Sequence, residues 1–145
     1  MANKTIKFEI VTPEKVVLKK DILQVSVPTT TGEITILPNH IPLISVLQPG
    51  VIEAKLEDGL IEIMSVSGGF IEVMKDKVVI LADTAERAEE IDEQRVGEAY
   101  LRAEELKKSA ESKDEAEFFA LTAKIEKELA RNRAVNRWRR IKGEK

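Results

Sequence analysis

Residues 80–92 read ILADTAERAEEID, and this stretch divides the chain into two parts of different composition. All five prolines and five of the seven glycines fall in residues 1–85, whereas residues 86–145 contain no proline. Proline and glycine mark turns between strands and interrupt helices, so the first part favours strands and the second favours helices. We therefore expect two domains, at residues 1–85 and 86–145.

Short segments in which apolar and polar residues alternate fill the first part. Residues 6–10 read IKFEI, with apolar side chains at every second position. Residues 23–27 read LQVSV, so Leu23 and Val25 are expected on one apolar face. A period of two is typical of half-buried strands. Further segments of strand composition lie at residues 15–19, 33–37, 42–47, 51–57, 60–66, 70–74 and 77–82. About nine or ten short strands at this spacing predict an N-terminal β-sandwich.

Apolar residues recur at helical spacing in the second part, which predicts two helices. Asp92 is the expected N-cap of the first helix. Asp114 and Glu117 form a capping-box pattern at the start of the second, so the turn between the helices is expected at residues 112–113. A connection this short makes the helices antiparallel neighbours. The expected fold class is all-β plus α: the sandwich is followed by a C-terminal antiparallel two-helix hairpin.

Opposite charges distinguish the two expected helices. Residues 86–117 carry twelve acidic and six basic side chains, whereas residues 118–145 carry three acidic and nine basic ones. The net charges attract, but a surface ion pair contributes only about 0–1 kcal/mol and is screened by salt. We therefore expect a hairpin that modest competing contacts can separate.

The apolar side chains of the second helix form a stripe along its surface, and this stripe moves to the opposite side of the helix toward the C-terminal end. At about 100° per residue, Phe118 and Ile125 lie on one side, whereas Ala134 and Trp138 lie on nearly the opposite side. One flat partner cannot cover both sides. Two explanations are open: Trp138 rests on the sandwich beyond a bend or frayed end, or the helix packs against different surfaces in different states.

Several classes of site are disfavoured by composition. There are no cysteines and one histidine, so disulfides are excluded and we expect no metal site. The start, MANKTIKFEI, lacks the apolar block of a signal peptide, and no apolar run approaches the roughly 20 residues that span a bilayer. Membrane association is therefore expected only through a partner.

Three stretches are specific enough to indicate a family: GEITILPNHIPLISVLQPG (32–50), SGGFIEV (67–73) and ADTAERAEEID (82–92). With the expected sandwich and hairpin, they resemble the epsilon subunit of bacterial and chloroplast F-type ATP synthase over essentially the whole chain. The resemblance implies a non-catalytic rotor component of the central stalk of a proton-translocating complex. It also implies that the sandwich binds the gamma subunit and rests on the c-ring, at the cytoplasmic face of the cell membrane.

The resemblance makes Glu33 and His40 candidate c-ring contacts, because the family's corresponding segment faces that ring. A turn framed by prolines has little conformational freedom to lose on docking. His40 has an alternative role, since its side chain can be satisfied within its own domain. Thr35 stands where the family usually has glycine, and we expect it to stiffen or alter the local turn.

Members of this family hold the helical domain folded down or extended along gamma, and in some bacterial members ATP holds the folded form. The ATP motif is I/L-D-x-x-R-A, and residues 91–96 here read IDEQRV, with Val96 in place of alanine. No cofactor is required, but ATP is a candidate regulatory ligand. The resemblance and the helical spacing give these candidate ATP contacts: Glu86, Ile91, Asp92, Arg95, Arg102, Arg133 and Arg137. The alternative is that Asp92 only caps a helix and the arginines are solvated.

The basic tail, RNRAVNRWRRIK (131–142), has six positive charges and no acid. By resemblance, the extended helix would inhibit ATP hydrolysis through contacts with the alpha and beta subunits. The candidates for these contacts are Arg133, Arg137, Trp138, Arg139 and Arg140.

Two other functions fit the sequence less well. A nucleic-acid-binding module would use the basic tail, but an acidic helix matches that tail and only one aromatic offers base stacking there. A small hydrolase would need His40 with Thr35 and Glu33, whose proximity in sequence is unspecific. The sequence therefore favours a stalk subunit without catalytic residues.

Overall fold

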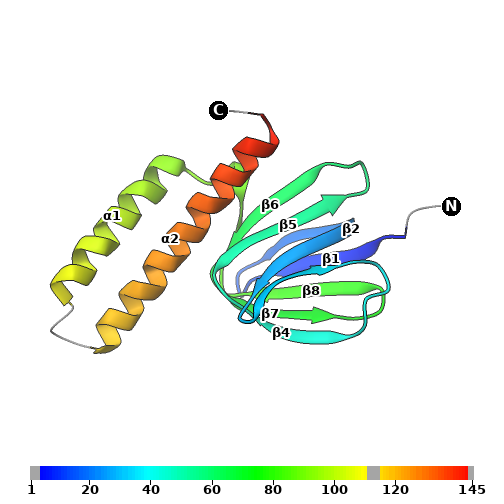
Figure 1. Cartoon of the computed structure of the whole chain (residues 1–145), viewed down its shortest axis with the longest axis horizontal. Coiled ribbons are helices and arrows are strands. Elements are labelled where there is room, and N and C mark those ends of the chain that lie inside the picture. Colours follow the sequence, from blue (N-terminus) through cyan, green and yellow to red (C-terminus); the bar gives the residue numbers. More distant parts are fainter. Residues whose placement is uncertain (1–3, 111–114, 144–145) are drawn as a thin grey trace.

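The computed structural model describes residues 4–110 and 115–143 as a β-sandwich followed by two helices (Figure 1). The strands are β1 (Ile6–Val11), β2 (Val16–Thr29), β3 (Gly32–Ile36), β4 (Leu43–Leu47), β5 (Gly50–Leu56), β6 (Ile61–Val66), β7 (Gly69–Val73), β8 (Lys77–Ala82) and β9 (Ala85–Arg87). A 3₁₀ helix, η1 (Ala88–Glu90), leads to α1 (Glu93–Ala110) and α2 (Glu115–Ile141). The predicted fold class is confirmed.

The strands form two layers joined by the long strand β2. Their order is β1-β8-β7-β4-β2-β5-β6-β9, with β3 paired to β2 and a further pairing of β1 with β2. Strands β1 and β8 run parallel, whereas the other pairs are antiparallel. Figure 1 shows β4, β7 and β8 in one layer and β5 and β6 in the other. The layers enclose one apolar core.

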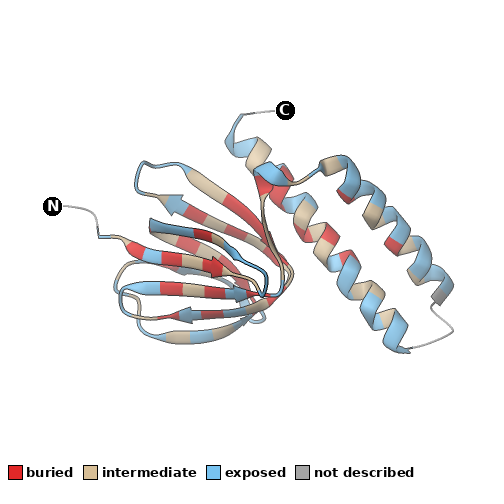
Figure 2. Cartoon of the chain, turned by 180° about the vertical axis from the view of Figure 1, so that it is seen from behind, coloured by how far each residue is buried: buried red, intermediate tan, exposed pale blue. Residues whose placement is uncertain are grey.

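Alternation along β1 matches the prediction, since Ile6, Phe8 and Ile10 are buried (Figure 2). Strand β2 differs, because one strand replaces the two predicted at 15–19 and 23–27. Its pairing with β5 shifts register between Ile22 and Gln24. Such a shift moves the following side chains to the opposite face. Ile22 and Val25 are therefore buried while Leu23 is only half-buried, which corrects the predicted apolar face.

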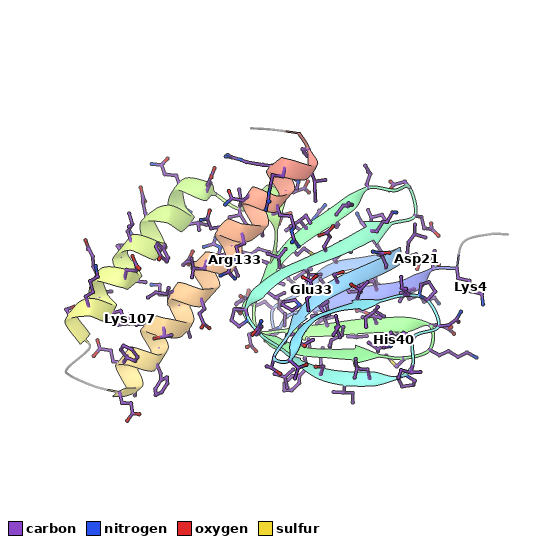
Figure 3. All side chains as sticks on the ribbon, in the orientation of Figure 1. Lys4, Asp21, Glu33, His40, Lys107 and Arg133 are labelled. Atoms are coloured by element: carbon purple, nitrogen blue, oxygen red, sulfur yellow. The ribbon has the colours of Figure 1, made fainter. Side chains whose placement is uncertain are left out.

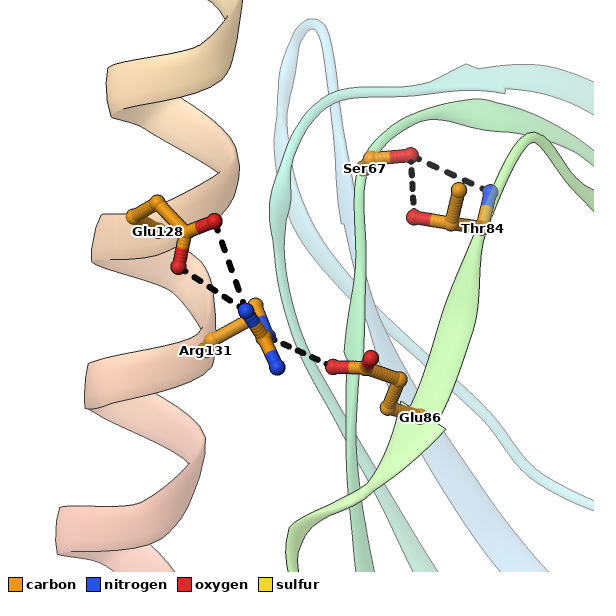
Figure 4. Close-up of polar contacts among 5 residues, drawn as sticks. All are labelled: Ser67, Thr84, Glu86, Glu128 and Arg131. Carbon is orange, nitrogen blue, oxygen red and sulfur yellow. Dashed lines mark hydrogen bonds and ion pairs between the residues drawn. The ribbon is translucent and has the colours of Figure 1, made fainter. Parts of the chain in front are cut away.

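The turn between β6 and β7 fits only a glycine. Gly69 has a φ of 134°, and a Cβ built there would lie 2.1 Å from the carbonyl oxygen of Leu81. Beside it, the Ser67 hydroxyl accepts hydrogen bonds from the Thr84 amide (3.1 Å) and hydroxyl (2.7 Å), which joins this turn to the β8–β9 turn (Figure 4). The paired glycines are therefore part of the scaffold.

The two helices lie side by side and antiparallel (Figure 1). Asp92 caps α1, since its Oδ1 accepts hydrogen bonds from the amides of Gln94 (3.1 Å) and Arg95 (3.2 Å). The predicted capping box at Asp114 and the turn at 112–113 fall outside the described residues. In the part of the chain that the structure describes, no helix is long and apolar enough to cross a membrane.

Different parts of α2 contact different partners. Near its start, the Lys107 ammonium of α1 lies 4.9 Å from the centre of the Phe118 ring. Near its end, Ala134 and Trp138 pack with Ile63 and Ala88 on the outer face of the sandwich. Trp138 therefore rests on the sandwich, as in the first of the two explanations for why the apolar side chains of this helix lie on two different sides.

Replacing Gly69 with alanine should lower the free energy of unfolding by about 2–4 kcal/mol, because the backbone is strained and the added methyl overlaps the Leu81 carbonyl. Urea unfolding followed by circular dichroism measures the loss. Gly97→Ala is the control: this site on α1 has open space, and the change should stabilise by about 0.5–1 kcal/mol. A Gly69→Ala variant as stable as the original chain would contradict the described turn.

Candidate functional site

Arg131 joins α2 to the sandwich through two carboxylates (Figure 4). Its Nη1 lies 3.0 and 3.3 Å from the two carboxylate oxygens of Glu128, one helical turn earlier. Its Nε donates to Oε2 of Glu86 on β9, at 2.6 Å. The Glu128 side chain is only 6% exposed, whereas that of Glu86 is 40% exposed. We call Glu86, Glu128 and Arg131 the Arg131 bridge.

Two further arginines of α2 form ion pairs with other elements. Nη1 of Arg137 lies 3.2 Å from Oε2 of Glu53 on β5. Nη2 of Arg139 lies 2.5 Å from Oε2 of Glu93 at the start of α1. Carboxylates therefore already engage part of the basic tail, which lowers the charge available for nucleic-acid phosphates.

An open hollow lies between the end of α2 and the sandwich. Its walls include Glu33 from β3, the Pro49–Gly50 corner before β5, and Arg133, Arg137 and Arg140 from α2. Its volume is about 340 Å³. Figure 3 shows Glu33 on the sandwich and Arg133 on the helix. Guanidinium groups that converge on one space favour an anionic ligand, but Arg137 is also paired with Glu53.

The structure does not bring the predicted ATP contacts together in one place. Arg133 and Arg137 line the hollow, whereas Arg95 and Arg102 do not and are exposed on α1. Asp92 is occupied as a helix cap and lies 4.0 Å from Arg95. The other two are engaged elsewhere: Ile91 packs in the cluster with Trp138, and Glu86 belongs to the Arg131 bridge. ATP binding by these residues stays a prediction.

The two predicted c-ring contacts differ in environment. Glu33 is exposed on β3, while His40 lies in the turn that follows (Figure 3). The His40 Nδ1–H donates to the Ile41 carbonyl at 2.7 Å, so this ring nitrogen is satisfied locally. Thr35 is an ordinary strand residue whose hydroxyl lies 2.7 Å from that of Ser26. The Thr35 hydroxyl is therefore directed to Ser26 on β2 rather than to His40, and the effect of Thr35 on the turn stays a prediction.

The predicted inhibitory contacts are partly occupied in this conformation. Trp138 packs on the sandwich, and Arg137 and Arg139 are ion-paired. Arg133 and Arg140 are exposed. A helix that used all five residues on another protein would first have to leave the sandwich.

An apolar row crosses the outer face of the layer that the helices leave uncovered. Val46, Phe70 and Leu81 are direct neighbours across β4, β7 and β8. The row continues through Val11 to Val16, which are paired at the β1–β2 end. Phe70 is 53% exposed, and Val16, Val46 and Leu81 are exposed to a similar degree. Exposed apolar patches of this kind are typical of surfaces that contact another protein, a membrane or a ligand.

Sequence reasoning missed the Arg131 bridge. The i, i+3 spacing of Glu128 and Arg131 is readable as a helical ion pair. Their burial is not, because the same pattern occurs on solvated helices. Nothing in the spacing links Arg131 to Glu86, 45 residues earlier.

Comparisons with known proteins agree with this fold. The family model described as ATP synthase, delta/epsilon chain, β-sandwich domain matches residues 5–88. An ATP synthase epsilon chain from Herpetosiphon aurantiacus is 46% identical over 110 residues, covering 76% of this chain and 80% of the relative. The epsilon chain of Bacillus licheniformis is 44% identical over 135 residues, covering 92% and 95%.

A solved structure is similar in three dimensions as well. A chain in the cryo-EM structure of the Euglena gracilis mitochondrial ATP synthase, OSCP/F1/c-ring, superposes with a TM-score of 0.78 and 25% identity. The match covers 90% of this chain and 81% of that chain. The class is therefore a non-catalytic stalk subunit of a rotary ATP synthase. The chain belongs to the ATP synthase epsilon chain family.

Replacing Asp92 with serine should separate its capping role from an ATP-binding role. Serine is a good N-cap, so the free energy of unfolding should change by less than about 0.5 kcal/mol, whereas alanine should cost about 0.5–2 kcal/mol. If the carboxylate contacts ATP, calorimetric titration should show ATP bound by the original chain and not by Asp92→Ser. Equal ATP affinity of the original chain and Asp92→Ser would show that Asp92 does not contact ATP. If the original chain binds no ATP up to millimolar concentration, the predicted ATP site does not exist.

Proposed function

We propose that this chain is the rotor subunit that links gamma to the c-ring in a proton-translocating ATP synthase. The observation that carries the proposal is the apolar row of Val16, Val46, Phe70 and Leu81. This row lies mainly on β4, β7 and β8, whereas α2 packs on β5 and β6. Because the chain belongs to an ATP synthase family, another stalk subunit is the natural partner of the row. We assign the row to gamma.

The c-ring would contact a different part of the sandwich. Glu33 and His40 come from β3 and the turn after it, and Glu33 is exposed. They supply polar groups suited to the polar loops of c subunits rather than to lipid. This arrangement would hold the chain at the cytoplasmic face of the cell membrane without inserting it into the bilayer.

The hairpin would regulate ATP hydrolysis by leaving the sandwich. Among the described residues, its contacts with the sandwich include a small apolar cluster and two ion-paired arginines, Arg131 and Arg137. Released from them, the basic end of α2 could reach acidic surfaces of the alpha and beta subunits. ATP bound only by the docked form would lower the population of the released form, by linkage.

Replacing Phe70 with glutamate should abolish assembly with gamma. A charge at the centre of the apolar row would be buried unpaired at the interface, and loss of a central aromatic contact alone costs about 2 kcal/mol or more in binding. Co-purification of gamma with the tagged chain measures assembly. Glu72→Gln, one row away on the same face, is the matched control and should assemble.

Unchanged gamma binding by Phe70→Glu would show that the row is not the gamma surface. The combined change Glu33→Ala and His40→Ala should give the opposite pattern: gamma still binds, while proton pumping driven by ATP falls. If this double variant pumps protons as fast as the original complex, neither Glu33 nor His40 is needed for the c-ring contact.

Deleting residues 114–145 should raise the ATPase activity of the assembled complex and leave its assembly intact. The reason is that the basic tail is removed while the apolar row is untouched. The measurement is the ATPase rate of purified complexes with matched subunit content. An unchanged rate would show that this chain does not inhibit.

A further inference from the structure

We propose that the Arg131 bridge is a reversible latch that holds the hairpin on the sandwich and opens only at its Glu86 end. The bridge has one buried end and one accessible end. Glu128 is almost fully buried, whereas Glu86 lies on β9 at the edge of the interface with a side chain 40% exposed. The proposal rests on the proposed mobility of the hairpin and adds the residues that control it.

The buried end stays intact whether or not the hairpin is docked. Glu128 and Arg131 belong to the same helix at i, i+3, and two hydrogen bonds at 3.0 and 3.3 Å join them. A buried carboxylate that loses its partner is strongly destabilising. Release of α2 avoids this cost, because Glu128 leaves the sandwich together with the arginine that neutralises it.

The accessible end is the part that breaks. Nε of Arg131 donates to Glu86 at 2.6 Å, through a different nitrogen from the one that holds Glu128. A guanidinium can serve two carboxylates in this way because its donors lie in a fixed plane. Glu86 reaches solvent readily once the helix leaves, so opening the latch leaves neither carboxylate buried without a partner.

Glu86 lies where the sandwich is connected to the hairpin, so its contact with Arg131 affects the position of the whole hairpin. Glu86 lies on the last strand, seven residues before α1 begins, and pairs in register with Ser65 of β6. The bridge therefore ties α2 to the segment that connects the sandwich to the hairpin. On the same helix, Ala134 and Trp138 pack on Ile63 and Ala88, so departure of α2 from the sandwich would expose Trp138 further.

Trp138 is the only tryptophan of the chain and reports docking directly. In the isolated full-length chain, Glu86→Gln should shift the ratio of docked to released hairpin roughly three- to ten-fold toward release, since it removes one charge-assisted hydrogen bond. Acrylamide quenching of Trp138 should rise and its emission should move to longer wavelength. Far-UV circular dichroism should be unchanged, because the helices stay formed.

Glu89→Gln is the matched control. The Glu89 side chain is also 40% exposed and lies three residues away, but its ion pair is with Arg87 rather than with α2. Quenching of Trp138 in this variant should equal that of the original chain. Arg131→Lys is the second test variant: it keeps the charge but not the planar fork, and it should loosen docking as Glu86→Gln does.

Sodium chloride gives an independent check. Salt should raise Trp138 quenching in the original chain and have little further effect in Glu86→Gln. Three results would each overturn the latch: quenching unchanged by Glu86→Gln, quenching raised equally by Glu89→Gln, or loss of helical signal in Glu86→Gln. These assays contain no other subunit, so a failed latch is distinguishable from a failed inhibitory role, which the deletion in the assembled complex tests.

Discussion

The structure depends on how the outer faces of a β-sandwich are covered. The inner faces bury each other, but both outer faces of this sandwich carry apolar side chains. On the layer with β5 and β6, Val51, Ile61 and Ile63 meet α2. On the opposite layer, Phe70 and its neighbours Val46 and Leu81 stay about half exposed within the described part of the chain. One face is thus covered by the chain itself, and the other is left for a partner.

This division separates assembly from regulation in space. The apolar row lies on the layer of β4, β7 and β8, away from the helices (Figure 1). Among the described residues, α2 docks mainly on β5, β6 and the β9–η1 connection. A helix can therefore move without disturbing the surface that would hold the subunit in the stalk. Separate surfaces are what a subunit needs if it is to stay attached while its regulatory part changes position.

The spacing of apolar residues predicted the architecture: every second residue in strands, and every third or fourth residue in helices. This spacing is informative because it follows directly from which side of a strand or helix is buried. The buried residues of β1 and the cap at Asp92 follow from local sequence. Leu23 shows the limit of such patterns: a single register shift beside it changes which face of β2 is buried. The short strand β9 was also missed, because three residues are too few to show a period. Its pairing with β6 is decided by the rest of the sheet.

Charge was the weakest guide to the site, because it predicts attraction without predicting partners. The acidic first helix and basic second helix suggested pairing within the hairpin, and Arg139 with Glu93 follows that expectation. Arg131 and Arg137 instead reach carboxylates of the sandwich strands. These partners fit the docked geometry: Ala134 lies in one apolar cluster with Ile63, and the same placement of α2 brings Arg131 to Glu86 and Arg137 to Glu53. Electrostatics in this chain therefore adjusts an interface that apolar packing positions.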